Sequence, residues 1–159
     1  MHEQIPMAAA AGADGVVLGA LEEEDQQLHA AMEGIVSRAK GFDLQVTLHR
    51  AFDATPDPYE TLEAAIALGI DRILSSGTAW GTSAGALAGL PVLEALCQRA
   101  QSRIEIVAAG GIDPKNAATI AHSLTRSGEP VSLHSYSGIK KNGAVSEQLV
   151  RSLKQYPPL

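Results

Sequence analysis

The sequence of 159 residues has little of what marks secreted, membrane-bound or nucleic-acid-binding proteins. Its single cysteine, Cys97, cannot form an internal disulfide, which fits a reducing compartment. No apolar run reaches the roughly 20 residues that a membrane-spanning helix needs. The 12 Lys and Arg are scattered and are outnumbered by 18 Asp and Glu, for a formal net charge of -6. We therefore expect neither nucleic acid nor a membrane as a partner.

Several common motifs are missing as well. The sequence has no Walker loop, no GxGxxG and no CxxC, which argues against the common nucleotide-binding and zinc classes. It is nevertheless 45% hydrophobic and 19% charged, as folded proteins are. No linker divides the chain, and its length suits one domain, residues 1–159, with its own core. Cys97 shares a helical face with Leu93 and Ala100, so we predict a small buried side chain there.

What the sequence does contain is one unit repeated five times, a short apolar strand followed by a loop and an amphipathic helix. The predicted strands are GVVLGAL (15–21), LQVTLHR (44–50), RILSS (72–76), IEIVAAG (104–110) and VSLHS (131–135). The predicted helices fall near 24–40, 57–68, 84–101, 114–127 and 145–155. This alternation predicts parallel strands joined by right-handed crossovers.

Polar residues in the strands favour a TIM barrel over an open doubly wound sheet. Thr47 and His49 share one face of the second strand, and Ser132 and His134 share one face of the fifth. Such a polar interior near the strand ends is typical of (β/α)8 barrels, whose carboxyl ends carry the chemistry. Because a complete barrel takes about 250 residues, the five units predict a partial (β/α)8 barrel.

The candidate site residues all lie at or just after the carboxyl ends of predicted strands, where parallel sheets bind ligands. These residues are His49, Arg50, Asp53, Ser75, Ser76, Gly77, Gly110, Gly111, His134 and Ser135.

The stretch VTLHRAFD places three titratable groups together after the second strand. His49, Arg50 and Asp53 could act as a base, an anion anchor and an orienting carboxylate. Alternatively, Arg50 and Asp53 form an ion pair between strand end and loop, with His49 donating to a backbone carbonyl. His49 and His134 could also ligate a metal with a third group. The residues themselves leave these hypotheses open.

The run AAGGIDPKN indicates an anion site. Gly110 and Gly111 let backbone N–H groups approach a ligand, and the positive end of the following helix points to the same place. The alternative is that the two glycines only permit a tight turn. The first interpretation predicts a small phosphorylated or carboxylated metabolite as the ligand.

Five stretches, taken in order, identify a family. They are GADGVVLGAL, VTLHRAFD, LGIDRILSSG, AAGGI with the following Asn116, and LHSYSG, and together they resemble the CutC family of copper homeostasis proteins. The resemblance runs from about Gly12 to the last helix and matches the five strands to strands 4–8 of the family's TIM barrel. It implies a cytoplasmic barrel that associates into homo-oligomers and binds copper as Cu(I). No enzymatic reaction follows from it.

The motif match carries over His49, Arg50, Asp53, Ser76, Gly77, Gly110, Gly111, His134 and Ser135 as the expected site residues. On this basis His49, Arg50 and Asp53 are candidate catalytic residues, and His49 with His134 are candidate copper ligands. Two departures stand out. The family's cysteine-containing first strand has no counterpart here, and Cys97 does not replace it, which removes the thiolates that Cu(I) prefers. The SLHSYSG run also differs from the family's pattern. A fragment without a function of its own is therefore a third hypothesis.

Overall fold

The computed structural model describes residues 3–22, 28 and 31–154 of the chain. Its main feature is a parallel sheet of five strands that lie side by side in chain order. The strands are β1 (Gly15–Leu18), β2 (Gln45–Leu48), β3 (Arg72–Ser75), β4 (Glu105–Ala108) and β5 (Val131–Leu133). This order, with a crossover between each pair of neighbours, confirms the repeated unit that the sequence predicts.

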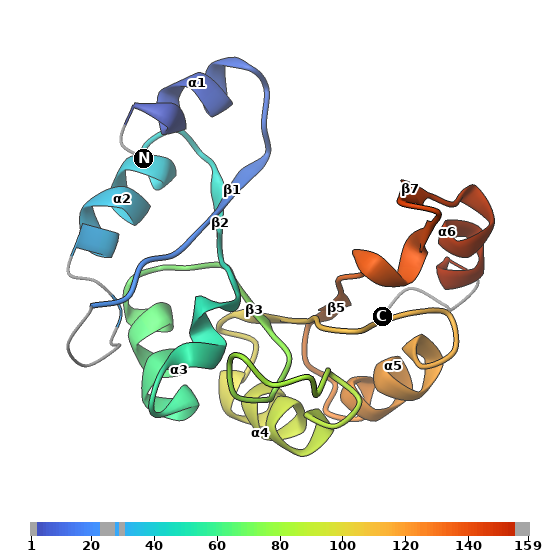
Figure 1. Ribbon diagram of the computed structural model, residues 1–159. Coiled ribbons are helices and arrows are strands. Elements are labelled where there is room, and N and C mark those ends of the chain that lie inside the picture. Colours follow the sequence, from blue (N-terminus) through green and yellow to red (C-terminus); the bar gives the residue numbers. More distant parts are fainter. Residues whose placement is uncertain (1–2, 23–27, 29–30, 155–159) are drawn as a thin grey trace.

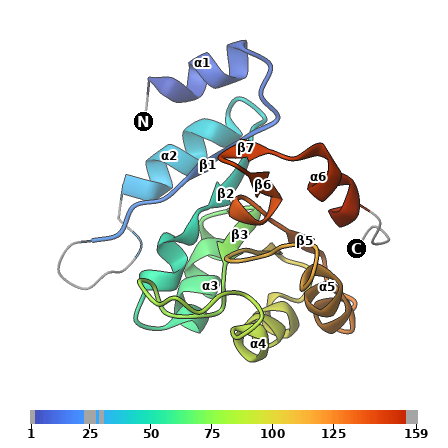
Figure 2. The same ribbon diagram turned by 45° about the vertical axis from the view of Figure 1, so that its right-hand side comes forward.

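Helices cover one face of this sheet and leave the other open (Figures 1 and 2). The helices of this outer layer are α2 (Ala31–Lys40), α3 (Pro58–Ala67), α4 (Leu90–Ala100) and α5 (Ala117–Thr125). The core lies between them and the sheet, where Leu48, Ile73 and Ile106 are fully buried in one cluster with helical residues such as Leu93 and Leu124. Burial of this apolar layer supplies most of the driving force for folding.

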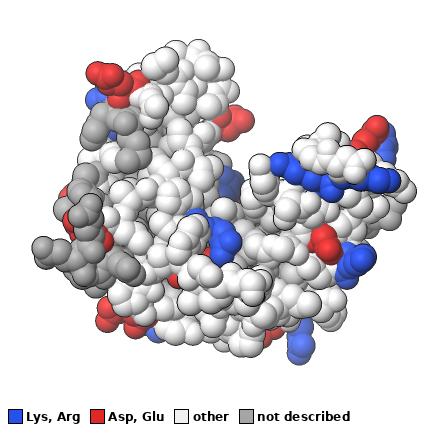
Figure 3. Space-filling model, in the orientation of Figure 1, with Lys and Arg blue, Asp and Glu red and all other residues white. Residues whose placement is uncertain are grey.

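The inner face of the sheet is more polar, as predicted. Thr47 pairs in register with Arg72, and Arg72 pairs with Glu105. The guanidinium Nε of Arg72 lies 2.6 Å from Oε2 of Glu105 on that face. Val17 of β1 is 66% exposed, which shows that the described residues do not cover this side of the sheet. The space-filling view shows the corresponding hollow, with Lys and Arg side chains along it (Figure 3).

Two predicted helices begin later than expected. The helix predicted near 24–40 begins at Ala31, and Leu28 instead forms an antiparallel bridge with Leu21. Residues 23–27 and 29–30 lie outside the described part of the chain. The helix predicted from residue 84 begins at Leu90, because Gly85 and Gly89 pack against backbone with no room for a Cβ atom.

The last predicted helix, near 145–155, is present as α6 (Glu147–Leu153), whereas helix α1 (Gln4–Ala10), the 3-10 helix η2 (Ser137–Ile139) and a short hairpin were not expected from the sequence. Helix α1 precedes β1 and buries Ile5. The hairpin, β6 (Lys140–Lys141) and β7 (Ala144–Val145), follows η2. Its turn residues Asn142 and Gly143 both have positive φ, as the two-residue Asn-Gly turn requires. Helix α6 completes this C-terminal arm.

Candidate functional site

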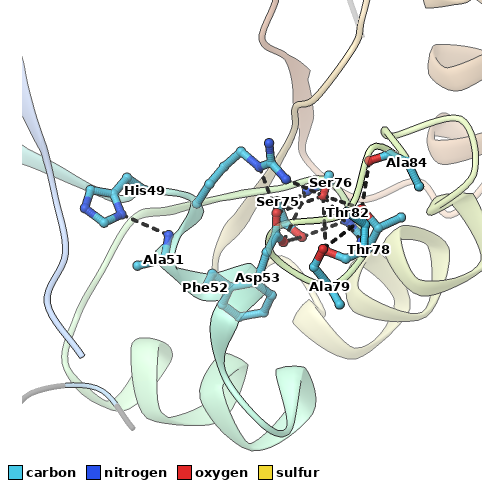
Figure 4. Close-up of polar contacts among 12 residues, drawn as sticks. His49, Ala51, Phe52, Asp53, Ser75, Ser76, Thr78, Ala79, Thr82 and Ala84 are labelled. Atoms are coloured by element: carbon cyan, nitrogen blue, oxygen red, sulfur yellow. Dashed lines mark hydrogen bonds and ion pairs between the residues drawn. The ribbon is translucent and has the colours of Figure 1, made fainter. Parts of the chain in front are cut away.

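The buried carboxylate of Asp53 organises the candidate site at the carboxyl edge of the sheet. The residue lies in a 3-10 helix, η1 (Arg50–Ala54), that directly follows β2, and its side chain is only 2% exposed. Oδ1 accepts a hydrogen bond of 2.6 Å from the Ser75 hydroxyl, and Oδ2 accepts one of 2.8 Å from the Ser76 hydroxyl. The Ser76 backbone N–H also points at this carboxylate. Asp53 therefore ties the end of β2 to the end of β3 (Figure 4).

The Arg50 guanidinium is held along one of its edges by the same group. Its Nε donates to Oδ2 of Asp53 at 2.8 Å, and its Nη2 donates to the Ser76 hydroxyl at 2.8 Å. The Ser76 hydroxyl therefore accepts from Arg50 and donates to Asp53, which links the three side chains in one network. Nε–H and the neighbouring Nη2–H form the side edge of the guanidinium fork. The end-on edge, formed by Nη1–H and the outer Nη2–H, takes no part in these bonds.

The loop after β3 contributes Thr78 and Trp80 to the site. The Thr78 hydroxyl lies 2.9 Å from the Ser76 hydroxyl and donates to the Ala84 carbonyl at 3.1 Å. The backbone N–H of Trp80 donates to the Asp53 carbonyl at 2.9 Å, and the Trp80 ring lies over the Arg50 guanidinium with its centroid 5.5 Å from Cζ. Sequence reasoning missed Thr78 and Trp80. The only sequence signal for them is their position directly after a predicted strand.

Gly110 lies beside the free edge of Arg50. Its φ is +95°, and a Cβ atom there would lie 3.6 Å from Nη1 of Arg50 and 3.0 Å from Cβ of Ser76. Gly111 also has a positive φ, of +69°. In the described part of the chain, the N–H groups of Gly110 and Gly111 donate to no protein acceptor, whereas the Gly110 carbonyl accepts from Ala86 N–H at 2.9 Å. Gly110 therefore brings backbone close to Arg50, and the positive φ angles of both glycines allow a turn.

Gly77, another predicted ligand-binding residue, has a packing role in the structure. Its φ is +67°, and a Cβ atom there would lie 2.3 Å from the Gly89 carbonyl oxygen. Its N–H donates to the Ser75 hydroxyl at 2.9 Å. Gly77 thus allows the loop after β3 to pass directly over Gly89, the residue that precedes α4.

His49 does not join the network around Asp53. Its Nδ1 accepts a hydrogen bond of 3.0 Å from Ala51 N–H, which places the ring proton of the neutral form on Nε2. Among the described residues no backbone carbonyl accepts a hydrogen bond from the His49 ring, so that part of the alternative is not observed, whereas its Arg50–Asp53 ion pair is present. The ring lies near Gly19, where a Cβ atom would come within 2.9 Å of it, and it points away from Asp53 in Figure 4.

His134 and Ser135 lie at the end of β5. The side chain of His134 is exposed, and its backbone N–H donates to the Ala108 carbonyl at 2.8 Å. The Ser135 hydroxyl donates to the Ile112 carbonyl at 2.6 Å and so joins β5 to the loop after β4. In the described ranges no group of three or more His, Cys, Asp and Glu could hold a metal ion.

Comparisons with known proteins agree with this fold. The CutC family profile matches residues 1–134. The protein CutC of Histophilus somni is 43% identical over 117 residues, which are 74% of this chain and 46% of that protein. The human copper homeostasis protein cutC homolog is 39% identical over 119 residues, 73% of this chain and 40% of that protein. The chain therefore spans less than half the length of these relatives.

A solved structure shows the same architecture. The crystal structure of CutC from Streptococcus agalactiae superposes with a TM-score of 0.72 at 27% identity. The match covers 83% of this chain and 60% of that one. It confirms the partial TIM barrel, because five parallel β/α units correspond to a part of the longer protein. On the profile match and the identity to these relatives, the chain belongs to the CutC family.

Proposed function

We propose that this chain contributes to copper homeostasis in the cytoplasm, as a self-associating protein. The support for a role in copper homeostasis is family membership and the name of its human and mouse relatives. In the described part of the chain no helix is long and apolar enough to cross a membrane. Within that role, the contacts at the carboxyl edge of the sheet favour a small anion over Cu(I) as the ligand.

The described residues do not fit a thiolate site for Cu(I). Cu(I) prefers soft ligands such as cysteine thiolate. Cys97 is fully buried in α4, and burial raises its pKa to about 11, so it stays a thiol. His49 and His134 offer imidazole nitrogens, but one nitrogen of His49 already accepts from the backbone. A copper site on this part of the chain would therefore consist of these two histidines alone or with a ligand from elsewhere.

An anion fits the same edge of the sheet better. We propose that a small phosphorylated or carboxylated molecule binds against the end-on edge of the Arg50 guanidinium. The observation that carries this proposal is that Asp53 and Ser76 hold the side edge, while within the described residues Nη1 and the outer hydrogen of Nη2 have no hydrogen-bond partner. Two parallel N–H donors in this geometry match the two oxygens of a carboxylate or phosphate.

The surroundings of Nη1 support this proposal. The backbone of Gly110 lies beside Nη1, because a Cβ atom on Gly110 would be 3.6 Å from Nη1. We propose that the unused N–H groups of Gly110 and Gly111 add neutral donors to the same anion. The negative charge of Asp53 is compensated by the Arg50 guanidinium and by hydrogen bonds from Ser75 and Ser76. Its side chain is also almost fully buried, so it does not face the ligand. Arg50 is thus held by hydrogen bonds to Asp53 and Ser76 and is not a mobile surface charge.

Isothermal titration with inorganic phosphate at low ionic strength tests the anion site. We expect the wild-type chain to bind, Arg50→Gln to bind at least about tenfold more weakly, and Arg50→Lys to fall between them because it keeps the charge but loses the fork. Arg126→Gln, at an exposed position on the C-terminal side of α5, is the matched control and keeps the wild-type affinity. Equal binding by wild type and both Arg50 variants would contradict the proposal, provided that circular dichroism shows all of them folded.

The same titration with Cu(I) tests the copper ligands. If His49 and His134 bind copper, the His49→Ala, His134→Ala double variant loses the uptake that the wild type shows. If the wild type takes up no more Cu(I) than the double variant does, copper binding by His49 and His134 is contradicted. Because neither imidazole hydrogen-bonds to Arg50, Asp53 or Ser76 in the described part of the chain, the double variant is expected to keep its phosphate affinity.

A further inference from the structure

The loop between β3 and α4 carries Trp80 at an unusual place. Trp80 is the only tryptophan of the sequence, and its side chain is 59% exposed. A single exposed apolar side chain is common on protein surfaces, but this one lies over the charged group of the proposed site. Trp80 belongs to none of the sequence motifs, and the proposed function does not use it.

The loop holds Trp80 in place at both ends. Thr78 is bonded to the Ser76 hydroxyl on one side of it, and the Thr82 hydroxyl donates to the Ala79 carbonyl at 2.9 Å on the other. The Trp80 N–H itself donates to the Asp53 carbonyl. Farther along, Ala86 N–H donates to the Gly110 carbonyl. The indole is therefore on a segment tied to the same three elements that form the anion site.

The indole lies over the guanidinium of Arg50, at 5.5 Å from centroid to Cζ. At this separation an aromatic face attracts the cation, and it also keeps water away from that side of the planar group. Asp53 and Ser76 restrain Arg50 within its plane, but they do not restrain it perpendicular to that plane. Trp80 supplies the missing restraint, so that the end-on edge keeps pointing at Gly110.

Resting on the proposed anion site, we infer that Trp80 is a positioning residue for it. By stacking on Arg50, Trp80 removes water from one face of the guanidinium and fixes the direction of its free edge. The Arg50 side chain is then already ordered before the ligand arrives, so it loses little conformational freedom on binding. Its positive charge is also less hydrated than that of an arginine on an open surface. Trp80 itself needs no contact with the ligand.

Phosphate titration of three Trp80 variants tests this inference. We expect Trp80→Ala to weaken phosphate binding about five- to tenfold and Trp80→Phe by less than about threefold, since phenylalanine keeps an aromatic face. Trp80→Leu keeps apolar cover without the π face and is expected to resemble Trp80→Ala. Phe42→Ala is the matched control and leaves affinity unchanged. It removes another exposed aromatic side chain, which precedes β2 and so lies at the amino ends of the strands, away from the site.

A second readout separates positioning from a merely structural role. Because Trp80 is largely exposed, the thermal midpoints of all three variants are expected to equal that of the wild type. In the wild type, saturating phosphate is expected to change the fluorescence of Trp80 and to lower its quenching by acrylamide. If wild type binds phosphate through Arg50 while Trp80→Ala binds equally well, the inference on Trp80 is wrong and the anion site stands. If Arg50→Gln binds as wild type does, the anion site itself is wrong.

Discussion

The carboxylate of Asp53 is the buried acceptor that joins the other polar groups of the candidate site. It accepts from Arg50, from the hydroxyls of Ser75 and Ser76, and from a backbone N–H, in a position almost closed to water. Replacing it with asparagine turns one acceptor into an NH₂ donor that faces other donors. Arg50 also loses its charge partner. A buried polar group left in this state is costly.

We therefore expect Asp53→Asn to lower the free energy of unfolding by about 3 kcal/mol. Urea denaturation followed by circular dichroism measures it. Asp14→Asn makes the same chemical change at an exposed residue and is expected to alter stability by less than about 0.5 kcal/mol. Equal stability of the two variants would show that the network around Asp53 contributes little to the fold.

The sequence could predict part of this site but not its side-chain directions. The run VTLHRAFD correctly placed Arg50 and Asp53 together at a strand end, because an arginine and an aspartate three residues apart in a turn can pair. The alternation of side chains along a strand predicts their directions only as far as Leu48, where β2 ends. After it the chain enters a 3-10 helix, and the His49 side chain turns away from Asp53. The contact of Trp80 with Arg50 joins residues on different loops, and no local pattern contains it.

At the scale of elements, the buried Cys97 of helix α4 leads us to predict how the stability of the fold depends on pH. Burial, together with the negative charges of Glu129 and Glu94, raises the pKa of the Cys97 thiol from its ordinary value of 9.0 to about 11. The folded chain therefore keeps its proton at pH values where the unfolded chain loses it. The stability that this group contributes is complete below pH 9 and is lost as the pH rises to about 11, by at most about 3 kcal/mol.

Denaturation curves at several pH values between 8 and about 11 measure this loss. The matched variant is Cys97→Ala, which is less stable at every pH because it leaves a small cavity, but which lacks the thiol. Its stability is expected to fall less steeply than that of the wild type over this range. Parallel curves for the two chains would mean that other groups account for the whole pH dependence.

The elements also show where prediction from sequence ends. Strand positions and helix α3 follow from local signals, such as Asp57, whose Oδ1 caps the helix by accepting from Tyr59 N–H at 2.7 Å. The start of α4 does not, because Gly85 and Gly89 are held in a loop by contacts with Gly110 and Ser76, far away in sequence. The Asn-Gly turn of the β6–β7 hairpin was a local signal that the sequence interpretation passed over.

At the scale of the whole molecule, the sheet has two edges. In the described part of the chain, β1 and β5 each have a neighbouring strand on one side only. Val17 on β1 is mostly exposed, and the inner face is hollowed in Figure 3. A closed barrel has no such edges, and an unpaired edge strand next to an exposed apolar side chain promotes association between chains.

We therefore expect self-association through the β1 edge and a midpoint of thermal unfolding that rises with protein concentration. Lysine on an edge strand opposes such pairing, so Val17→Lys should shift the sedimentation profile toward the monomer. Because Val17 points away from the helical core, this change should leave the far-ultraviolet circular dichroism spectrum as it is. Leu87→Lys, at another exposed apolar residue in the loop before α4, controls for the added charge and should sediment as the wild type does. A dilute monomer with one sharp, concentration-independent transition would contradict the expectation, because it would show that five β/α units are stable with both edges open.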